Sequence, residues 1–164
     1  MEGGATTRFI YDGAKVVLER DGDDETEARY THEGGSLYDD LLSQRRDGAS
    51  YDYLLDGLAS VKQVVDSSED VRNSYSYEAF GQATVGQSDV SNPYLFVGGY
   101  GVQWESTPSL YFMQARYYGP GVGRFLSEDP YGGAPQDPLS LHRYLYCANG
   151  PASDVDPAGR SKAA

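Results

Sequence analysis

The sequence contains few reactive side chains, and their spacing does not favour a pair in which one acts as nucleophile and the other as base. Cys147 and His142 are the most obvious pairing of a nucleophile with a base. Five residues of helix would place them roughly 140° apart, which disfavours direct contact. With His32 as the other histidine, the chain has too few Cys and His ligands for a four-ligand zinc site. We therefore expect Cys147 to be a small buried residue and His142 to be a packed or surface residue.

Two further stretches suggest a ligand at first sight, but their details do not fit. The acidic run 21–25 lacks the ligand spacing and the terminal glutamate of an EF-hand loop. The glycine-rich run 119–123 is not followed by the Lys-Ser/Thr of a phosphate-binding loop. We predict a solvated hairpin turn and a simple loop at these places, with no metal and no cofactor.

The charge balance bears on the partners of the protein. The chain has 13 Lys and Arg against 25 Asp and Glu, a net charge of −12. Contact with phosphates requires a basic surface, so this balance argues against nucleic acid and against anionic membrane surfaces. No apolar run approaches the length of a membrane span, and the first residues show no signal peptide. The compartment is therefore unknown from the residues themselves.

The composition and an internal repeat point to β structure. The 164 residues include 15 Tyr and 20 Gly, which suit half-buried strands and tight turns. Tyrosine is followed four residues later by glycine at three places, with tyrosine-to-tyrosine steps of 23 and 24 residues. A period of this length fits two short strands and two turns per unit. The repeats begin at Tyr30, Tyr53 and Tyr77, and Tyr-Asp recurs at Tyr38-Asp39 and Tyr51-Asp52.

Local patterns predict the elements that would position any site. Alternating apolar residues between turn signals predict strands, and Asp137-Pro138 with Gly150 frames one helix. The expected strands are 8–11, 16–20, 27–31, 51–55, 61–65, 71–77, 94–97, 110–118 and 124–126. The expected helix is 138–148, the expected surface loop is 82–92, and a frayed tail follows Arg160.

From residue 51 onward the sequence carries a series of motifs in a fixed order. It runs through YDYLLDG, NPYLFVGG and LYFMQARYYGPGVGRFLSEDP to DPLSLHRYLYCANGPASDVDPAGR. This series resembles the Rhs/YD-repeat family, specifically the repeat-associated core domain that closes its repeat array. The resemblance implies degenerate YD-type repeats over 1–50, the core domain over 51–160 and a tail over 161–164. The implied fold class is mainly β: an antiparallel β-hairpin ribbon, a fragment of an Rhs shell, with one short helix near the C-terminus.

The resemblance also implies a site. The core domain of this family can cut its own chain just past the final Asp-Pro-x-Gly motif, and it resembles an aspartic protease in using two aspartates helped by an arginine. The matching positions are Arg116 in Ala-Arg-Tyr-Tyr, Asp129 in Glu-Asp-Pro and Asp156 in Asp-Pro-Ala-Gly, with the cleavage position at Gly159 and Arg160. Two carboxylates held close together cannot both ionise, so one can act as an acid while the other activates water.

Local chemistry offers a second interpretation of the same residues. Asp-Pro commonly opens turns, and Arg116 could pair with an acid on a neighbouring strand. Arg160 stands where self-cutting relatives usually have an apolar residue, and four residues follow it, so a cut after Arg160 would release no toxin domain.

We therefore expect a non-catalytic structural and interaction module rather than an enzyme. It would act through self-association or as a subunit of a larger assembly, because open strand edges attract protein partners. Two alternatives remain: an aspartyl autoprotease that trims its own tail, and a glycan or cell-surface binding module that uses the tyrosines. The resemblance suggests an extracellular or cell-surface setting.

Overall fold

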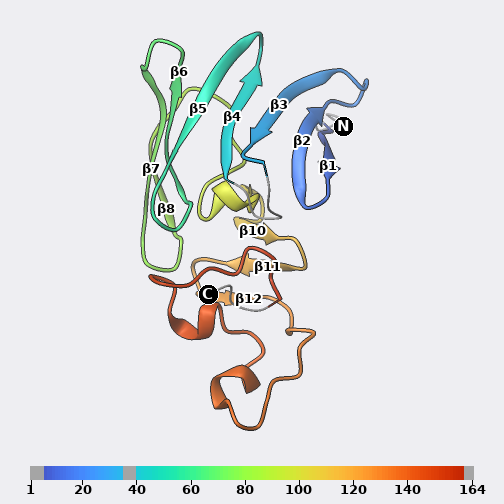
Figure 1. Ribbon diagram of the computed structural model, residues 1–164, viewed down its shortest axis with the longest axis vertical. Coiled ribbons are helices and arrows are strands. Elements are labelled where there is room, and N and C mark those ends of the chain that lie inside the picture. Colours follow the sequence, from blue (N-terminus) through green and yellow to red (C-terminus); the bar gives the residue numbers. More distant parts are fainter. Residues whose placement is uncertain (1–5, 35–39, 161–164) are drawn as a thin grey trace.

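The protein, seen in a computed structural model that describes residues 6–34 and 40–160, consists of two antiparallel sheets joined by loops and short 3-10 helices (Figure 1). The predicted Tyr38-Asp39 repeat and the predicted tail 161–164 lie outside the described residues. The larger sheet has eight strands in chain order: β1 (Arg8–Asp12), β2 (Lys15–Arg20), β3 (Thr26–His32), β4 (Leu41–Arg46), β5 (Ala49–Leu55), β6 (Val61–Asp66), β7 (Val71–Tyr77) and β8 (Ala83–Ser88).

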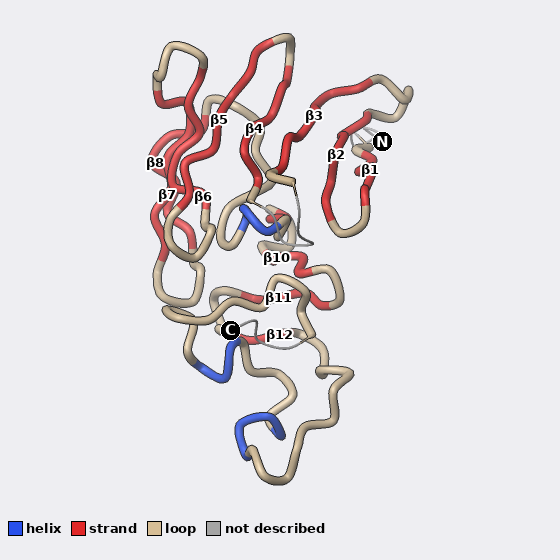
Figure 2. The backbone as a smooth tube through the Cα atoms, in the orientation of Figure 1, coloured by secondary structure: helices blue, strands red, loops and turns tan. Residues whose placement is uncertain are grey.

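The smaller sheet follows in the sequence and has fewer and shorter strands (Figure 2). Its four strands lie in the order β12-β11-β10-β9: β9 (Gln103–Glu105), β10 (Leu110–Met113), β11 (Arg116–Gly119) and β12 (Arg124–Phe125). The helices are η1 (Gly98–Tyr100), η2 (Pro138–Leu141) and η3 (Cys147–Asn149). No helix among the described residues is long and apolar enough to cross a membrane. The predicted fold class, mainly antiparallel β, is confirmed.

The tyrosine repeat corresponds to one hairpin per period. Tyr30 on β3 and Tyr53 on β5 are each only 7% exposed, and the third repeat tyrosine, Tyr77 on β7, is half-buried on the same face as Tyr75, which is 7% exposed. Alternate strands thus place a tyrosine on the same inner face, as the two-residue period of a strand requires. Because these tyrosines are buried, they do not form the exposed platform that a glycan-binding module would need.

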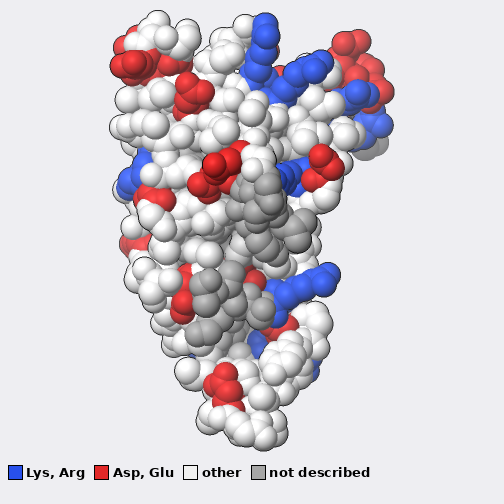
Figure 3. All heavy atoms as spheres, viewed as in Figure 1, with Lys and Arg blue, Asp and Glu red and all other residues white. Residues whose placement is uncertain are grey.

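The turns between the strands are held by aspartates. The side chains of Asp21, Asp56 and Asp66 each accept hydrogen bonds from the backbone N–H groups two and four residues later. Short polar side chains of this kind favour turns over continued strands. The acidic run 21–25 therefore forms a hairpin turn, as predicted. Figure 3 shows groups of acidic side chains at the top left and top right of the view, at the ends of the larger sheet.

The apolar segment 94–97 is the centre of the core and is not the strand that its composition predicts. Tyr94, Leu95, Phe96 and Val97 are all at most 4% exposed. Leu95 accepts a hydrogen bond from the Val61 N–H instead of joining a ladder, and Val97 has φ of 53°. A short apolar run fits a buried loop as well as a buried strand, so its pattern could not separate the two.

Two further expectations about strands and loops are wrong, and two strands were not predicted. The expected strand 110–118 is a hairpin, β10 and β11, because Gln114 turns the chain with φ of 51°. The expected loop 82–92 contains β8, while β4 and β9 were not predicted.

The expected helix 138–148 is two short 3-10 helices separated by a turn at 143–144 and a single β-bridge at Leu145. Asp137 does cap the first of them, through a hydrogen bond from the Leu139 N–H. Residues 142–146 then run alongside β12, where the Phe125 N–H donates to the Tyr144 carbonyl. Cys147, Ala148 and Asn149 all have positive φ, which a right-handed helix excludes.

Aromatic side chains join the two sheets. Phe96 contacts Tyr111, Tyr118 and Tyr146, with ring centroids 5.8 to 6.5 Å apart. The Tyr111 hydroxyl donates to the Gly81 carbonyl at 3.0 Å, and the Tyr118 hydroxyl donates to the Phe80 carbonyl at 2.8 Å. The smaller sheet is therefore fixed to the β7–β8 turn, and this attachment positions the residues that follow β11.

Candidate active site

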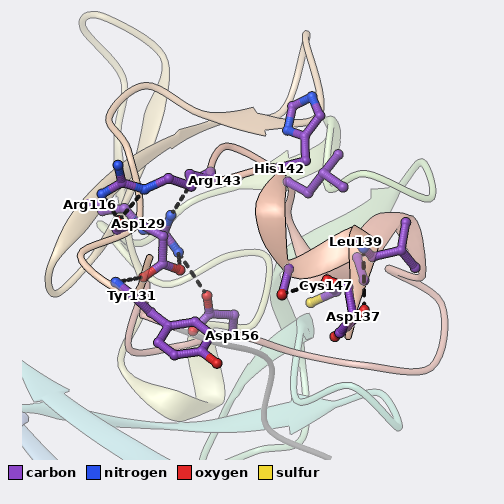
Figure 4. Close-up of a pocket in the computed structure, with 12 residues that line it drawn as sticks. Arg116, Asp129, Tyr131, Asp137, Leu139, His142, Arg143, Cys147 and Asp156 are labelled. Atoms are coloured by element: carbon purple, nitrogen blue, oxygen red, sulfur yellow. Dashed lines mark hydrogen bonds and ion pairs between the residues drawn. The ribbon is translucent and has the colours of Figure 1, made fainter. Parts of the chain in front are cut away.

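The structure brings together the three residues that the family resemblance implies. Arg116 is the first residue of β11, Asp129 follows β12, and Asp156 lies after η3. One guanidinium nitrogen, Nη2 of Arg116, lies 2.9 Å from Oδ2 of Asp129 and 3.3 Å from Oδ2 of Asp156. Both carboxylates therefore meet at a single donor atom, although they are 13 and 40 residues from the arginine in sequence (Figure 4).

Arg116 is held rigidly by its surroundings. It is 3% exposed, and its guanidinium lies over the Phe125 ring at 3.6 Å from the centroid. Its Nη1 donates to the Arg143 carbonyl at 3.1 Å. Burial lowers the pKa of Arg116, while Asp129 and Asp156 oppose that shift. An arginine keeps its charge under such conditions, so it can hold two carboxylates in place.

Asp129 has both roles that the sequence allowed: it forms a turn, and it pairs with Arg116. Its Oδ1 accepts a hydrogen bond from the Tyr131 N–H at 2.8 Å, which is the turn expected of Asp-Pro. Its Oδ2 pairs with Arg116. The turn aims the carboxylate at the guanidinium, so the structural role and the proximity to Asp156 do not exclude each other.

Asp156 faces the predicted cleavage position. The residue is 2% exposed, and its Oδ1 accepts a hydrogen bond from the Arg160 N–H at 3.1 Å. On the other side of the same peptide unit, Nε of Arg116 donates to the Gly159 carbonyl at 2.5 Å. The peptide that joins Gly159 to Arg160 is therefore bound at its oxygen and at its nitrogen.

Gly159 is required by this arrangement. Its φ is +61°, and a Cβ at this position would lie 2.4 Å from the Met113 carbonyl oxygen. A residue with a side chain could not pass so close to the β10–β11 turn. The glycine of the Asp-Pro-Ala-Gly motif thus allows the chain to reach Arg116.

Arg143 is part of the site and was not predicted. Its Nε and Nη2 donate to the Asp129 carbonyl at 2.9 and 2.5 Å, and its own carbonyl accepts from the Asp129 N–H. Its Nη1 also pairs with Glu128 at 2.5 Å. No local signal identifies such a residue, because its main partners are backbone atoms 14 residues away. Arg143 acts as a positioning residue for Asp129.

A pocket of about 270 Å³ opens beside the carboxylates. Arg116, Asp129 and Asp156 line one part of it, and Asp137, His142 and Cys147 line another (Figure 4). Cys147 is buried, as predicted, and the exposed His142 contacts Nη1 of Arg124 at 3.2 Å. A pocket of this size admits water to a carboxylate pair, which is the arrangement that aspartyl hydrolysis needs.

Comparisons with known proteins give relatives in sequence. No protein-family model matches the chain. The tRNA3(Ser)-specific nuclease WapA of Bacillus spizizenii is 34% identical over 95% of this chain, and the tRNA nuclease WapA of Bacillus subtilis is 32% identical over 95%. Salivary gland surface protein 1 of Aedes aegypti is 28% identical over 73%. The chain spans only 7% of the length of each WapA protein.

Solved structures with the same fold are toxin-complex chains. A TcdB2–TccC3 complex without its hypervariable C-terminal region matches 97% of this chain with a TM-score of 0.69 and 20% identity. The Tc holotoxin pore of Photorhabdus luminescens matches 94% with a TM-score of 0.67 and 19% identity. In both cases the match covers 8% of the other chain. At this level of identity the likeness establishes the fold.

These findings correct the functional expectations. The prediction of a non-catalytic module that is not an enzyme is contradicted, because relatives that match 95% of the chain are named tRNA nucleases. The same names oppose the prediction that nucleic acid is excluded. The expectation of protein partners agrees with neighbours that belong to multi-subunit toxin complexes. Taken together, these matches support an Rhs-type relation for this chain, and the solved structures establish its fold.

Proposed function

We propose that this chain is a segment of an Rhs-type toxin protein with nuclease activity on tRNA, and that the segment itself carries out aspartyl self-cleavage. The names of the sequence relatives support the first part, and the site geometry supports the second. Residues 51–160 would be the repeat-associated core domain, and residues 1–50 would continue the repeat ribbon upstream of it. Cleavage just past the Asp-Pro-Ala-Gly motif would separate this core from whatever follows.

One observation carries the proposal of self-cleavage. Oδ2 of Asp129 and Oδ2 of Asp156 bind the same nitrogen of Arg116, beside a peptide that Asp156 and Arg116 also bind. An ordinary structural ion pair needs one carboxylate and no bound peptide. The buried cation stabilises negative charge at the pair, while the adjoining pocket supplies water.

Each group would then have a defined task. The carboxylate pair takes a proton from the attacking water and later returns it to the departing amide nitrogen, which is general base and general acid catalysis by one unit. Arg116 positions both carboxylates and stabilises the charge that develops on the carbonyl oxygen. The apparent pKa values of such a reaction belong to the pair and not to either aspartate.

The test is the intact mass of the purified 164-residue chain, followed over days, beside two variants. Asp129→Asn removes one carboxylate and should leave the full-length mass. Asp137→Asn changes another carboxylate of the same pocket, and asparagine can keep its cap of η2, so this variant should be cut like the wild type. A wild-type mass that never changes, or a cut that persists in Asp129→Asn, contradicts the proposal.

The nuclease part needs its own assay. The full protein that contains this segment should convert total tRNA into discrete fragments on a denaturing gel. An intact tRNA pool at high protein concentration would contradict the assignment. Because the tRNA assay and the mass measurement are independent, one part of the proposal can fail while the other holds.

The protein partner would join at a free strand edge. β1 is one of the two edge strands of the larger sheet, with β8 at the other edge, and it pairs only with β2 within the described part of the chain. Unpaired edge groups accept another strand, so we propose that a further hairpin pairs with β1. Ile10, which is 40% exposed on β1, offers the test, because Ile10→Lys should reduce association in light scattering. Unchanged association would exclude this edge.

A further inference from the structure

We propose that the ring of Phe125 positions Arg116 for self-cleavage, by holding the guanidinium in the orientation in which both aspartates share its Nη2 atom. This inference rests on the proposed function and adds a positioning residue to it. Phe125 is the second residue of β12, and its side chain can neither donate nor accept a proton. Its contribution is therefore geometric: it selects between two ways in which Arg116 can bind carboxylates.

Arg116 binds its two aspartates in an unusual way. The common arrangement is a fork, in which two nitrogens of an arginine donate in parallel to the two oxygens of one carboxylate. Here Nη2 is shared between Asp129 and Asp156, whose Oδ2 atoms lie at 2.9 and 3.3 Å. Nε and Nη1 donate to main-chain carbonyls, those of Gly159 and Arg143. A guanidinium that turned toward one aspartate would form the fork and lose the other aspartate, so a further contact must favour the shared arrangement.

The face of the guanidinium provides that contact. Cζ of Arg116 lies 3.6 Å from the centroid of the Phe125 ring, and both residues are at most 3% exposed. The hydrogen-bond acceptors approach the guanidinium at its edges, whereas the ring packs against its face. A cation is attracted to the negative face of an aromatic ring, and the attraction is stronger where water is excluded. Any turn of the guanidinium toward a single aspartate would lift it from the ring and lose this attraction.

The Phe125 ring is itself fixed, so it can act as a reference surface. Its backbone N–H donates to the Tyr144 carbonyl at 3.0 Å. Its ring meets those of Tyr118 and Tyr146 edge-on, with centroids 5.7 and 5.9 Å apart. Both tyrosines also contact Phe96 in the centre of the core. The orientation of Arg116 is therefore determined by the aromatic core and not by the aspartates alone.

Phe96 offers a matched control within the same core. Phe96 and Phe125 are each 2% exposed, and both contact Tyr118 and Tyr146. The guanidinium of Arg116 lies over Phe125, and in the described part of the chain no cation lies over Phe96. A change in the electrons of the ring should therefore disturb packing equally at the two positions but affect Arg116 only from position 125.

The experiment replaces Phe125, and separately Phe96, with pentafluorophenylalanine in the full 164-residue chain. Fluorination keeps the ring and nearly its shape, but it reverses the charge of the ring face, so the face repels a cation. The first measurement is the exchange of the Arg116 Nε hydrogen with water, followed by nuclear magnetic resonance. This hydrogen is buried and bonded to the Gly159 carbonyl, so it should exchange slowly in the unmodified protein.

We expect the change at Phe125 to speed this exchange by about ten-fold or more, and the change at Phe96 to leave it within a few-fold. Backbone amide exchange of β5 and β6 in the same samples measures any general loss of stability, which would affect both modified proteins. Equal exchange of the Arg116 hydrogen in the two modified proteins would overturn the inference, whether or not the chain cuts itself.

The second measurement is the rate of self-cleavage, followed by intact mass. Because a small displacement of a catalytic group has a large effect on rate, the change at Phe125 should slow the cut by about ten-fold or more relative to the change at Phe96. Equal rates in the two modified proteins would overturn the inference and leave self-cleavage standing. An unmodified chain that stays intact would overturn the proposed function, and the exchange measurement would still decide whether Phe125 orients Arg116.

Discussion

The two sheets of this protein are built by different kinds of interaction. In the larger sheet, the turn aspartates bond to N–H groups two and four residues away, and each strand pairs with its neighbour in sequence. Beyond β8, the key side-chain bonds span 38 to 43 residues, from Tyr118 to Phe80 and from Arg116 to Asp156 and Gly159. The first region is a scaffold of sequential strand pairings, to which Gln44 and Tyr53 add side-chain hydrogen bonds with Ser91 and Asn92. The second region forms the site through polar contacts between residues far apart in the sequence. A buried polar group that lost such a partner would cost free energy.

The two regions nevertheless share one core. Tyr94 contacts Tyr30 and Tyr53 of the larger sheet, and Phe96, two residues later, contacts Tyr111 and Tyr118 of the smaller sheet. We therefore expect the regions to unfold together but to respond differently to substitutions.

High pH should have the largest effect and should test the shared core. Burial raises the pKa of Tyr30 and Tyr53 in the larger sheet and of Tyr111, Tyr118 and Tyr146 beside the smaller one. Since the folded-state pKa values lie above the unfolded value of 10, this stability is fully present below pH 10 and is lost as the pH rises further. Each such tyrosine removes up to about 1.4 kcal/mol per pH unit above 10.

Tyrosinate absorbance and far-ultraviolet circular dichroism, recorded between pH 9 and 12, measure this loss. We expect one cooperative step in which most tyrosines ionise as the sheets unfold. Two separate steps would show that the regions are independent and would contradict the shared core.

Arg116→Ala should give the next largest effect. It leaves the buried Asp156 without its cation, and loss of one partner of a buried ion pair costs about 3–5 kcal/mol. The matched variant in the larger sheet is Arg72→Ala, which removes a half-buried ion pair with Asp66 and should shift the unfolding midpoint much less. Urea unfolding of both variants measures the difference. Equal midpoints would mean that the long-range contacts contribute no more than this pair.

Gly159→Ala should have a smaller effect, confined to the site. The left-handed φ costs about 1–2 kcal/mol for alanine, and the clash with Met113 would displace the peptide from Arg116. We expect a strong loss of self-cleavage with little change in hydrogen exchange of the larger sheet. Gly57→Ala is the control, because its Cβ would have no atom within 4 Å. Cleavage at the wild-type rate in Gly159→Ala would show that the close approach is not needed.

Arg143→Lys should give the smallest change in stability and a measurable change in rate. Lysine keeps the charge but cannot donate two hydrogen bonds from a rigid fork to the Asp129 carbonyl. Small displacements of a catalytic group can cost up to about a hundred-fold in rate, so we expect cleavage to slow about ten-fold or more. The pH dependence of the rate should keep its shape, since Arg143 positions Asp129 without donating a proton. A shifted pH profile would instead assign it a direct role.

The hairpins of the larger sheet could be predicted wherever side chains alternate between faces. β7 agrees with its predicted bounds, and the tyrosine period gave the hairpin length. β4 was not predicted from the sequence because one of its two fully buried positions is a glutamine, Gln44, which breaks the apolar alternation. The segment 142–146 resembled helix because its pairing with β12 depends on distant residues that no local pattern records.

The site was predictable only in part and only through motifs. Arg116, Asp129 and Asp156 are far apart in the sequence, and their residue types alone suggest turns and an ion pair. The motif order of the family that the chain resembles implied one site for them, and in the structure both aspartates contact Arg116. Arg143 could not be found in this way, because it acts through the backbone of Asp129. A hydrogen bond from a side chain to a distant backbone atom does not require a particular residue type at the acceptor, so sequence patterns do not reveal it.

The position of Asp156, four residues before Arg160 and bonded to its backbone, has a kinetic consequence. Catalyst and substrate are the same stretch of chain, so the reaction would be first order and independent of protein concentration, and each molecule would turn over once. No Michaelis constant would describe it. An inhibitor added in solution would have to displace a tethered substrate whose effective concentration is on the order of millimolar or higher. Such a cut is best controlled by the folding of the chain, since the site exists only after Arg116, Asp129 and Asp156 have met.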